Sequence, residues 1–197
     1  MSFGNPTKKN HPRGALQSLV LLELAIKRII ADGHLFYSTP KEYIDANGKL
    51  VKYFPYISRD QLLSGDANAR YYLSVATVKS ITPIDGKISR KRENFHSMWA
   101  IMLDDIGTKA DSPPLKPSFT IETSPNNFQW WYILSTPITD YNLAQKVVKT
   151  IHNSKYTDES GGNPARLGRL PMGINGSIEK HGAIFTIFLN ATINPHR

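Results

Sequence analysis

Apolar residues recur at helical spacing along two segments of the chain. Over residues 16–31 they form one stripe, and the Asp32-Gly33 pair that follows is a typical helix end. Over residues 141–153 the spacing predicts a second amphipathic helix, with Asp140 as its N-cap. The expected buried stripe of this second helix is Leu143, Val147, Val148 and Ile151. The pattern thus predicts two helices that lie far apart in the sequence.

Segments rich in β-branched and aromatic residues predict the strands. Residues 70–79 and 97–103 are two of them, and the second is mostly apolar, which favours a central position in a sheet. Residues 183–190 are predicted to form a final strand. The Asn47-Gly48 dipeptide lies between two short extended runs and favours a type I′ turn, so a small hairpin is predicted there.

A second hairpin is predicted over residues 119–134, with a four-residue loop in its middle. Its register decides which side chains share a face. If Thr123 lies opposite Phe128, the next pair outward from the loop is Glu122 with Gln129. These two polar side chains would then share one face of the hairpin. The other face would carry Ile121, Thr123, Phe128 and Trp130.

The alternation of strands with two helices around one sheet predicts an α+β (α/β) fold. We expect an RRM-like palm, in which helices flank a mixed sheet. Residues 1–14 have little apolar content and are predicted to be a mobile basic arm. Residues 15–69 would form an N-terminal helix and hairpin appendage, and residues 70–197 would form the palm.

The composition excludes some functions and favours others. The chain has 197 residues, a formal net charge of +8 and no cysteine. The absence of cysteine excludes a disulfide framework, a zinc ribbon and a thiol nucleophile, and leaves oxygen ligands as the expected metal chemistry. The basic balance suits a polyanionic partner such as nucleic acid or nucleotide. Without a membrane-length apolar run or a signal-peptide pattern, a soluble cytoplasmic protein with no membrane contact is expected.

Four basic residues gather in one short segment, namely Lys87, Arg90, Lys91 and Arg92. Aromatic residues flank this segment in the sequence. Cations beside aromatic rings are what proteins use to bind single-stranded nucleic acid. A solvated loop explains the same cluster equally well. Both interpretations of the segment therefore stay open at this point.

Two adjacent aspartates, Asp104 and Asp105, end the apolar run over residues 97–103. Carboxylates at the end of a buried strand commonly hold Mg²⁺ or Mn²⁺ over a polyphosphate. An Asp pair at this place is also typical of a solvated turn or a helix cap. Because neighbours in an extended strand point to opposite faces, the pair can share a metal only if the chain already turns at Ile106-Gly107.

Three motifs follow one another along the chain. They are LDD-x-GTK at residues 103–109, ETSP-x-N-x-Q at residues 122–129, and R-x-x-RLP-x-G-x-N at residues 166–175. In this order and spacing they resemble the RepB-type branch of the archaeo-eukaryotic primase superfamily, in particular primase domains of bacteriophage and mobile-element replication proteins. The resemblance covers residues 70–190. It implies a metal-dependent DNA primase or primase-polymerase, a nucleotidyltransferase that makes primers on single-stranded DNA.

The resemblance also implies roles for individual residues. Its catalytic group would be Asp104, Asp105 and Glu122. Mg²⁺ or Mn²⁺ would be held by Asp104, Asp105 and Asp158, although Asp158 lies further upstream than its counterpart in relatives and can instead only stabilise its loop. Gln129 stands where the superfamily has a His, so phosphate binding there would not depend on pH near neutrality. The implied nucleotide- and phosphate-binding residues are Lys109, Ser124, Asn127, Gln129, Arg166, Arg169 and Asn175.

Single-stranded DNA template and nucleoside triphosphates are the partners that the resemblance implies. No GxxxxGK[ST] motif is present, so a replicative helicase would be a further, separate partner. Two alternatives stay open. The first is a primase-like module that has lost catalysis and binds single-stranded DNA or a replication origin. The second is a nicking or nuclease domain, which is disfavoured because no Tyr lies near a cluster of His residues.

Overall fold

A computed structural model describes residues 13–30, 32–83, 87–158, 162–173, 184–187 and 192–193, the last two ranges as backbone only. Within these ranges the helices are α1 (Arg13–Lys27), α2 (Arg59–Leu63) and α3 (Tyr141–His152), with a short 3₁₀ turn, η1, at Arg92–Asn94. The strands are β1 (Tyr37–Ser38), β2 (Lys41–Ile44), β3 (Leu50–Tyr53), β4 (Tyr56–Ile57), β5 (Arg70–Ser74), β6 (Ala76–Val78), β7 (Phe95–Ile106), β8 (Phe119–Ser124), β9 (Asn127–Ile138), β10 (Leu167–Gly173), β11 (Ile184–Ile187) and β12 (Thr192–Ile193).

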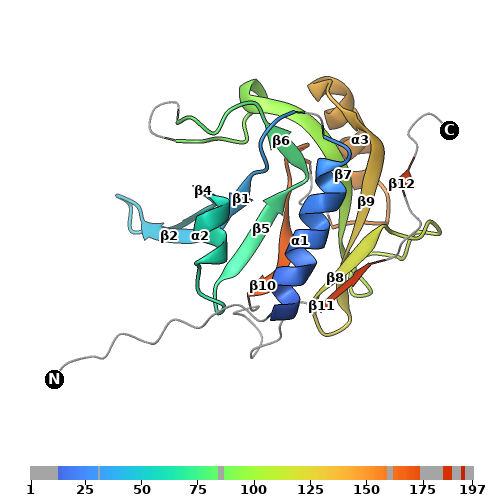
Figure 1. Cartoon of the computed structure of the whole chain (residues 1–197), viewed down its shortest axis with the longest axis horizontal. Coiled ribbons are helices and arrows are strands. Elements are labelled where there is room, and N and C mark those ends of the chain that lie inside the picture. Colours follow the sequence, from blue (N-terminus) through green and yellow to red (C-terminus); the bar gives the residue numbers. More distant parts are fainter. Residues whose placement is uncertain are drawn as a thin grey trace.

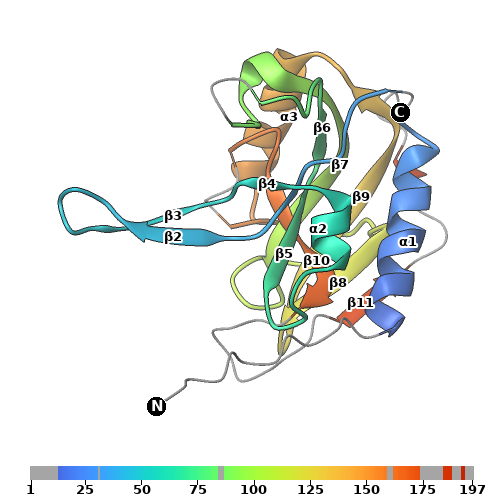
Figure 2. The same cartoon turned by 60° about the vertical axis from the view of Figure 1, so that its left-hand side comes forward.

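The strands form two main sheets and a hairpin. The larger sheet has the order β11-β8-β9-β7-β6, with β12 beside β9, and the smaller has the order β10-β5-β1-β4. The β12–β9 pair is parallel and the other described pairs are antiparallel, so the large sheet is mixed. The β2–β3 hairpin projects away from the rest of the molecule (Figure 2). The predicted α+β class with a mixed sheet and flanking helices is therefore confirmed (Figure 1).

Val75 joins the two sheets. The single strand predicted over residues 70–79 is in fact two strands, β5 and β6, which lie in different sheets. Between them, the Val75 amide donates to the carbonyl oxygen of Arg166 at 2.9 Å. The Val75 carbonyl accepts from the amides of Trp99 at 3.0 Å and Ala100 at 3.3 Å. One peptide segment thus connects the start of β10 to the middle of β7.

The hydrophobic core is continuous across both sheets and α1. Leu19 and Ile26 of α1 are fully buried together with Leu73 of β5, and the stacked rings of Trp99 and Trp131 lie 5.8 Å apart in the same cluster. Burial of this apolar surface is the main force that holds the elements together. No described helix is long and apolar enough to cross a membrane.

Residues 15–69 do not form an appendage that packs separately. Strands β1 and β4 from this region lie in the same sheet as β5 and β10, and α1 packs beside β10 (Figure 1). The predicted boundary between residues 69 and 70 therefore crosses a shared sheet and core. The predicted basic arm ends earlier than expected because α1 starts at Arg13, and the first twelve residues lie outside the described ranges.

The small hairpin and the second helix are confirmed, each with one local difference. In the β2–β3 turn only Gly48 has a positive φ, +75°, so the predicted type I′ turn, which needs two such residues, is wrong. In α3, Asp140 Oδ1 accepts a hydrogen bond from the amide of Leu143 at 2.8 Å, as predicted for the N-cap. The predicted stripe is wrong at Leu143, which is 51% exposed, because Ala144 takes the buried position.

The register of the β8–β9 hairpin differs from the prediction by one residue. Glu122 pairs with Phe128, and Ile121 pairs with Gln129, because the register shifts between Glu122 and Ser124. Directly opposed residues share a face. Glu122 and Gln129 therefore lie on opposite faces of the sheet, and the predicted polar pair does not form.

Candidate functional site

The Asp104-Asp105 pair lies on a β-bulge near the end of β7. The register with β9 shifts between Leu103 and Ile106, and Asp105 adopts a left-handed conformation with φ of +60°. Asp tolerates this region better than most residues, because its short polar side chain forms local hydrogen bonds. The Asp105 carbonyl accepts from the amides of the three residues 108–110 at 3.0–3.2 Å. The turn predicted at Ile106-Gly107 is therefore confirmed, with Asp105 as its first residue and Gly107 at φ of +90°.

Asp104 is held by contacts from several elements. Its Oδ1 accepts from the Asp105 amide at 3.0 Å, and its Oδ2 accepts from Gln129 Nε2 at 3.1 Å and from Arg166 Nη2 at 3.2 Å. The Asp104 amide donates to Thr157 Oγ1 at 3.2 Å. Burial raises the pKa of Asp104, and the charge of Arg166 partly opposes this effect.

Arg166 connects Asp104 to a second carboxylate from a distant part of the chain. Its Nη2 lies 2.5 Å from Asp158 Oδ1 as well as 3.2 Å from Asp104 Oδ2, and its Nη1 donates to Thr157 Oγ1 at 3.3 Å. Two carboxylate oxygens therefore converge on one positively charged nitrogen. This point between Asp104 and Asp158 is a place that favours a cation, and Arg166 supplies one there.

Asp105 has a different set of partners. Its Oδ2 accepts from Lys109 Nζ at 2.9 Å and its Oδ1 accepts from Asn127 Nδ2 at 3.0 Å. Thr108 Oγ1 donates to the Asn127 amide oxygen at 3.1 Å. The hydrogen bond that Lys109 donates to Asp105 raises the pKa of the exposed Lys109 ammonium. The hydrogen bonds of Asp105 and Thr108 to Asn127 thus link the end of β7 to the β8–β9 turn, where Ser124 pairs with Asn127.

Gln129 has both of its polar side-chain atoms engaged within the protein. It is 4% exposed; its Nε2 donates to Asp104 Oδ2, and its Oε1 accepts from the amide of Arg169 at 2.8 Å. The side chain therefore ties β9 to both β7 and β10. Glu122, on the opposite face, accepts from the Asn126 amide at 3.1 Å with its Oε1.

Arg169 is a buried cation on strand β10. The side chain is 6% exposed, and its guanidinium lies 5.5 Å from the centre of the Tyr72 ring. Within the described ranges its Nε and Nη2 atoms are buried without a hydrogen-bond partner. A buried, unpaired cation is costly, so Arg169 is a candidate for binding an anion.

The two predicted phosphate-binding arginines do not face one anion in this structure. Arg166 pairs with carboxylates, whereas Arg169 packs on Tyr72. Gly168 between them lies against Trp131, and a Cβ added there would come within 2.0 Å of the indole ring. Asn175, the last residue of the predicted set, lies outside the described ranges.

The basic segment at residues 87–92 divides into two kinds of residue. Arg90 stacks over Phe36 at 5.4 Å and donates to the carbonyl of Ala165, and burial lowers its pKa to about 10. Arg92 lies 5.1 Å over the ring of Tyr141, at the start of α3. Both arginines therefore support the fold directly. Lys87 and Lys91 are exposed.

Thr157 and the structural role of Gln129 are the parts of the site that sequence reasoning missed. Thr157 contacts both Asp104 and Arg166 through its hydroxyl, yet a lone Thr in a loop carries no sequence signal. Within the described ranges no three His, Cys, Asp or Glu side chains form a group that could hold a metal ion. Asp104 and Asp158 instead both pair with Arg166.

The fold has similar solved structures. The AEP domain of the cyanophage S-2L primase-polymerase (PrimPol) matches over 95% of this chain and 96% of that one, with a TM-score of 0.61 and 15% identity. The catalytic domain of primase RepB′, in complex with initiator DNA, matches over 90% of this chain and 87% of that one, with a TM-score of 0.52 and 14% identity. A second RepB′ structure matches over 58% of its own length.

The sequence matches no protein-family model and no curated protein. The structural similarity therefore shows the fold, which is that of the RepB-type and archaeo-eukaryotic primases, in agreement with the resemblance seen in the motifs. The similarity extends over residues 15–69 as well as the predicted palm, because it covers nearly the whole chain.

Proposed function

We propose that this chain is a metal-dependent primase-polymerase domain, which joins nucleotides into primers on single-stranded DNA. The observation that carries the proposal is the convergence of Asp104 and Asp158 on one cationic position, next to Asp105. The primase-type fold around these residues supports it.

Asp104, Asp105 and Asp158 would hold Mg²⁺ or Mn²⁺. Their carboxylate oxygens are the ligand atoms that these ions prefer. In this structure the positively charged Arg166 Nη2 lies between the carboxylates of Asp104 and Asp158. When bound, the metal lowers the pKa of an attacking hydroxyl and neutralises charge on the leaving pyrophosphate. Arg166 would then be released from the carboxylates to bind phosphate, since a guanidinium pairs with either anion. The role of Glu122 as a further catalytic carboxylate stays a prediction.

Several cations and polar groups are available to bind the triphosphate. Arg169 contributes a guanidinium with two unpaired nitrogens, and Lys109 contributes an exposed ammonium beside Asp105. Ser124 and Asn127 remain proposed donors to phosphate, as does Asn175, which lies outside the described residues. Because Gln129 is buried with both polar atoms engaged, we propose that it acts by positioning Asp104 rather than by contact with phosphate.

Single-stranded DNA would be the template, and nucleoside triphosphates the substrates. The solved RepB′ catalytic domain is in complex with initiator DNA, which supports DNA binding by this fold. Lys87 and Lys91 are exposed cations of the basic segment and would contact the DNA backbone, whereas the exposed Arg92 already packs on Tyr141. A replicative helicase is proposed as a further partner on the resemblance alone.

A second candidate function is a primase-like module that binds single-stranded DNA without catalysis. The position of Arg166 favours it, because a guanidinium held 2.5 Å and 3.2 Å from the two carboxylates competes with a metal for the same place. The two candidates differ in whether a divalent metal displaces Arg166 when nucleotide is present.

Primer synthesis on single-stranded DNA, with labelled ATP and dNTPs and with Mg²⁺ or Mn²⁺, tests the proposal. We expect labelled products from the wild-type protein and none from the double variant Asp104→Ala, Asp105→Ala. Asp111→Ala is the matched control, because Asp111 is an exposed aspartate just after the same turn. If wild type makes no product yet binds the strand, the non-catalytic module becomes the better assignment.

A further inference from the structure

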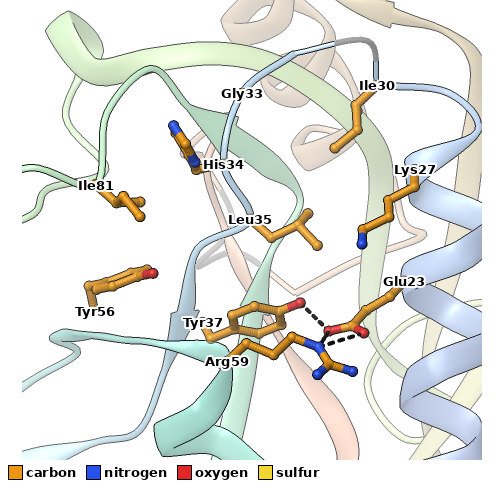
Figure 3. Close-up of a pocket in the computed structure, with 10 residues that line it drawn as sticks. All are labelled: Glu23, Lys27, Ile30, Gly33, His34, Leu35, Tyr37, Tyr56, Arg59 and Ile81. Atoms are coloured by element: carbon orange, nitrogen blue, oxygen red, sulfur yellow. Dashed lines mark hydrogen bonds and ion pairs between the residues drawn. The ribbon is translucent and has the colours of Figure 1, made fainter.

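A cavity of about 340 Å³ is lined by residues of α1, β1, β4 and α2 and of the segment just before β1 (Figure 3). Strand β5 separates β10 from β1, and no residue that lines the cavity belongs to the candidate site described above. The volume falls within the range of small-molecule sites, about 300–1,000 Å³. The cavity is therefore a second, separate place where a ligand can fit.

A buried carboxylate organises one wall of this cavity. Glu23 is 5% exposed; it accepts from the Tyr37 hydroxyl at 2.5 Å and from Arg59 Nε at 3.0 Å with each of its oxygens. These bonds fix the Arg59 guanidinium through its Nε. No described residue accepts from the two Nη groups of Arg59, which in Figure 3 point away from Lys27, on the other side of the Glu23 carboxylate.

A second cation and a hydroxyl point into the same space. The ammonium of Lys27 is directed into the cavity from the last turn of α1, and no described residue forms an ion pair with it (Figure 3). The Tyr56 hydroxyl is directed toward the middle of the cavity from the opposite side (Figure 3). Lys27 and Arg59 outnumber the single carboxylate of Glu23, so the lining is net positive and favours an anion.

The remaining lining is apolar or aromatic. Ile30, Leu35 and Ile81 contribute aliphatic surface, and Tyr56 contributes the face of a half-buried ring. A flat, weakly polar group can pack on such a wall, as bases do on aromatic side chains. The site thus combines donors for a phosphate with a surface for a base, and both belong to one ligand class.

We propose that this cavity binds a nucleoside monophosphate unit, with its phosphate on the Lys27 ammonium and its base against Tyr56 and the aliphatic wall. The unit can be a free mononucleotide or the phosphorylated end of a DNA strand, since both present the same chemistry. Binding here requires neither a divalent metal nor the carboxylates of the candidate site. The inference therefore does not rest on the proposed function.

Titration calorimetry of the full chain with dAMP, in EDTA, tests this site. We expect saturable binding that Lys27→Gln weakens about tenfold or more, the scale of a lost charge-assisted hydrogen bond. Arg28→Gln is the matched control: it removes the same charge from the neighbouring exposed residue of α1, which does not line the cavity. Tyr56→Phe keeps the ring and is expected to weaken binding by a smaller factor.

Three further titrations separate the possible outcomes. The double variant Asp104→Ala, Asp105→Ala is expected to bind dAMP as wild type does, so a failure of primer synthesis leaves this result intact. A 5′-phosphorylated oligonucleotide that binds more tightly than its 5′-hydroxyl form through Lys27 identifies a strand end as the source. The proposal is overturned if the wild-type protein binds neither dAMP nor the oligonucleotide. It is also overturned if Lys27→Gln and Arg28→Gln lower the affinity for dAMP equally.

Discussion

Arg169 illustrates how one residue can serve binding at the expense of stability. Its guanidinium is buried over Tyr72 with two nitrogens unpaired among the described residues. An uncompensated buried charge destabilises the folded state, unless a ligand supplies the missing partner. The residue is therefore poorly explained by packing and well explained by an anion that binds there.

For Arg169→Met we expect opposite changes in stability and in binding. Replacing the unpaired cation by an apolar chain of similar length should raise the free energy of unfolding by about 1 kcal/mol. The same change should weaken ATP binding by about 1–3 kcal/mol, the scale of a lost charged hydrogen bond. Urea unfolding and ATP titration measure the two effects. Lowered stability together with unchanged ATP affinity would remove Arg169 from the site.

Tyr37 is a second single residue with a testable effect, on how the stability of the protein depends on pH. Burial, followed by the hydrogen bond to Glu23, raises the pKa of Tyr37 above its ordinary value of 10.0. The folded state thus keeps the Tyr37 hydroxyl neutral, whereas the same hydroxyl ionises above about pH 10 in the unfolded chain. The contribution of Tyr37 to the free energy of unfolding is therefore complete below that pH and decreases as the pH rises.

Tyr37→Phe removes this source of alkaline sensitivity. At pH 8 the variant should be less stable by about 1–2 kcal/mol, because the buried Glu23 loses one hydrogen-bond donor. Above pH 10 the difference in the free energy of unfolding between variant and wild type should become smaller. Denaturant unfolding at pH 8 and pH 10.5 measures it, with Tyr43→Phe, an exposed tyrosine, as control. A gap that is constant across this range would contradict the assignment.

At the scale of elements, strand β10 carries Arg169 and begins directly after Arg166, and its position depends on contacts that no local pattern reveals. Its amide at Arg169 bonds to the side chain of Gln129, and its Gly168 lies against Trp131. Gly168, Pro171 and Gly173 lie within this short segment, and such residues do not indicate a strand by themselves. The strand forms because β5 and Gln129 offer hydrogen-bond partners from distant parts of the chain.

Gly168→Ala should therefore destabilise the protein by about 1–3 kcal/mol, the usual range for overpacking. The new Cβ would meet the Trp131 ring at 2.0 Å, so β10 or the ring must shift. The midpoint of urea unfolding reports the change. Gly162→Ala is the matched control, because nothing lies within 4 Å of a Cβ there. Equal midpoints for the two variants would show that β10 is not packed as described.

The difference between local patterns and contacts over long sequence distances explains how much of the structure the sequence could predict. Periodicity placed α1, α3 and both hairpins, because amphipathic spacing and turn residues are local properties. The one-residue error in the β8–β9 register arose from a bulge, which depends on the neighbouring strands. In the site, the resemblance implied roles for Asp104, Asp158 and Arg166, but only the fold showed that Arg166 lies between the two carboxylates.

At the scale of the whole molecule, the N-terminal region is part of one cooperative unit. Helix α1 supplies Leu19 and Ile26 to the shared core, and β1 and β4 complete the small sheet beside β5. A chain that lacks these elements would expose the apolar face that α1 covers and would leave β5 unpaired along one edge.

A fragment of residues 70–197 should consequently fail to fold by itself. We expect no cooperative thermal transition by circular dichroism, whereas a fragment of residues 13–197 should unfold near the temperature of the full chain. The comparison isolates the contribution of residues 13–69. A cooperative transition in the shorter fragment would mean that the palm is independent of the elements before it.

The peptide unit at Val75 has a consequence for observing the site at work. Its amide bonds to Arg166 O while its carbonyl accepts from Trp99 and Ala100 on the strand that carries Asp104. Any movement that draws Arg166 away from Asp104 by shifting its backbone must therefore stretch one of these bonds. The hydrogen-exchange rate of the buried Val75 amide should therefore increase under conditions in which the backbone at Arg166 moves away from Asp104.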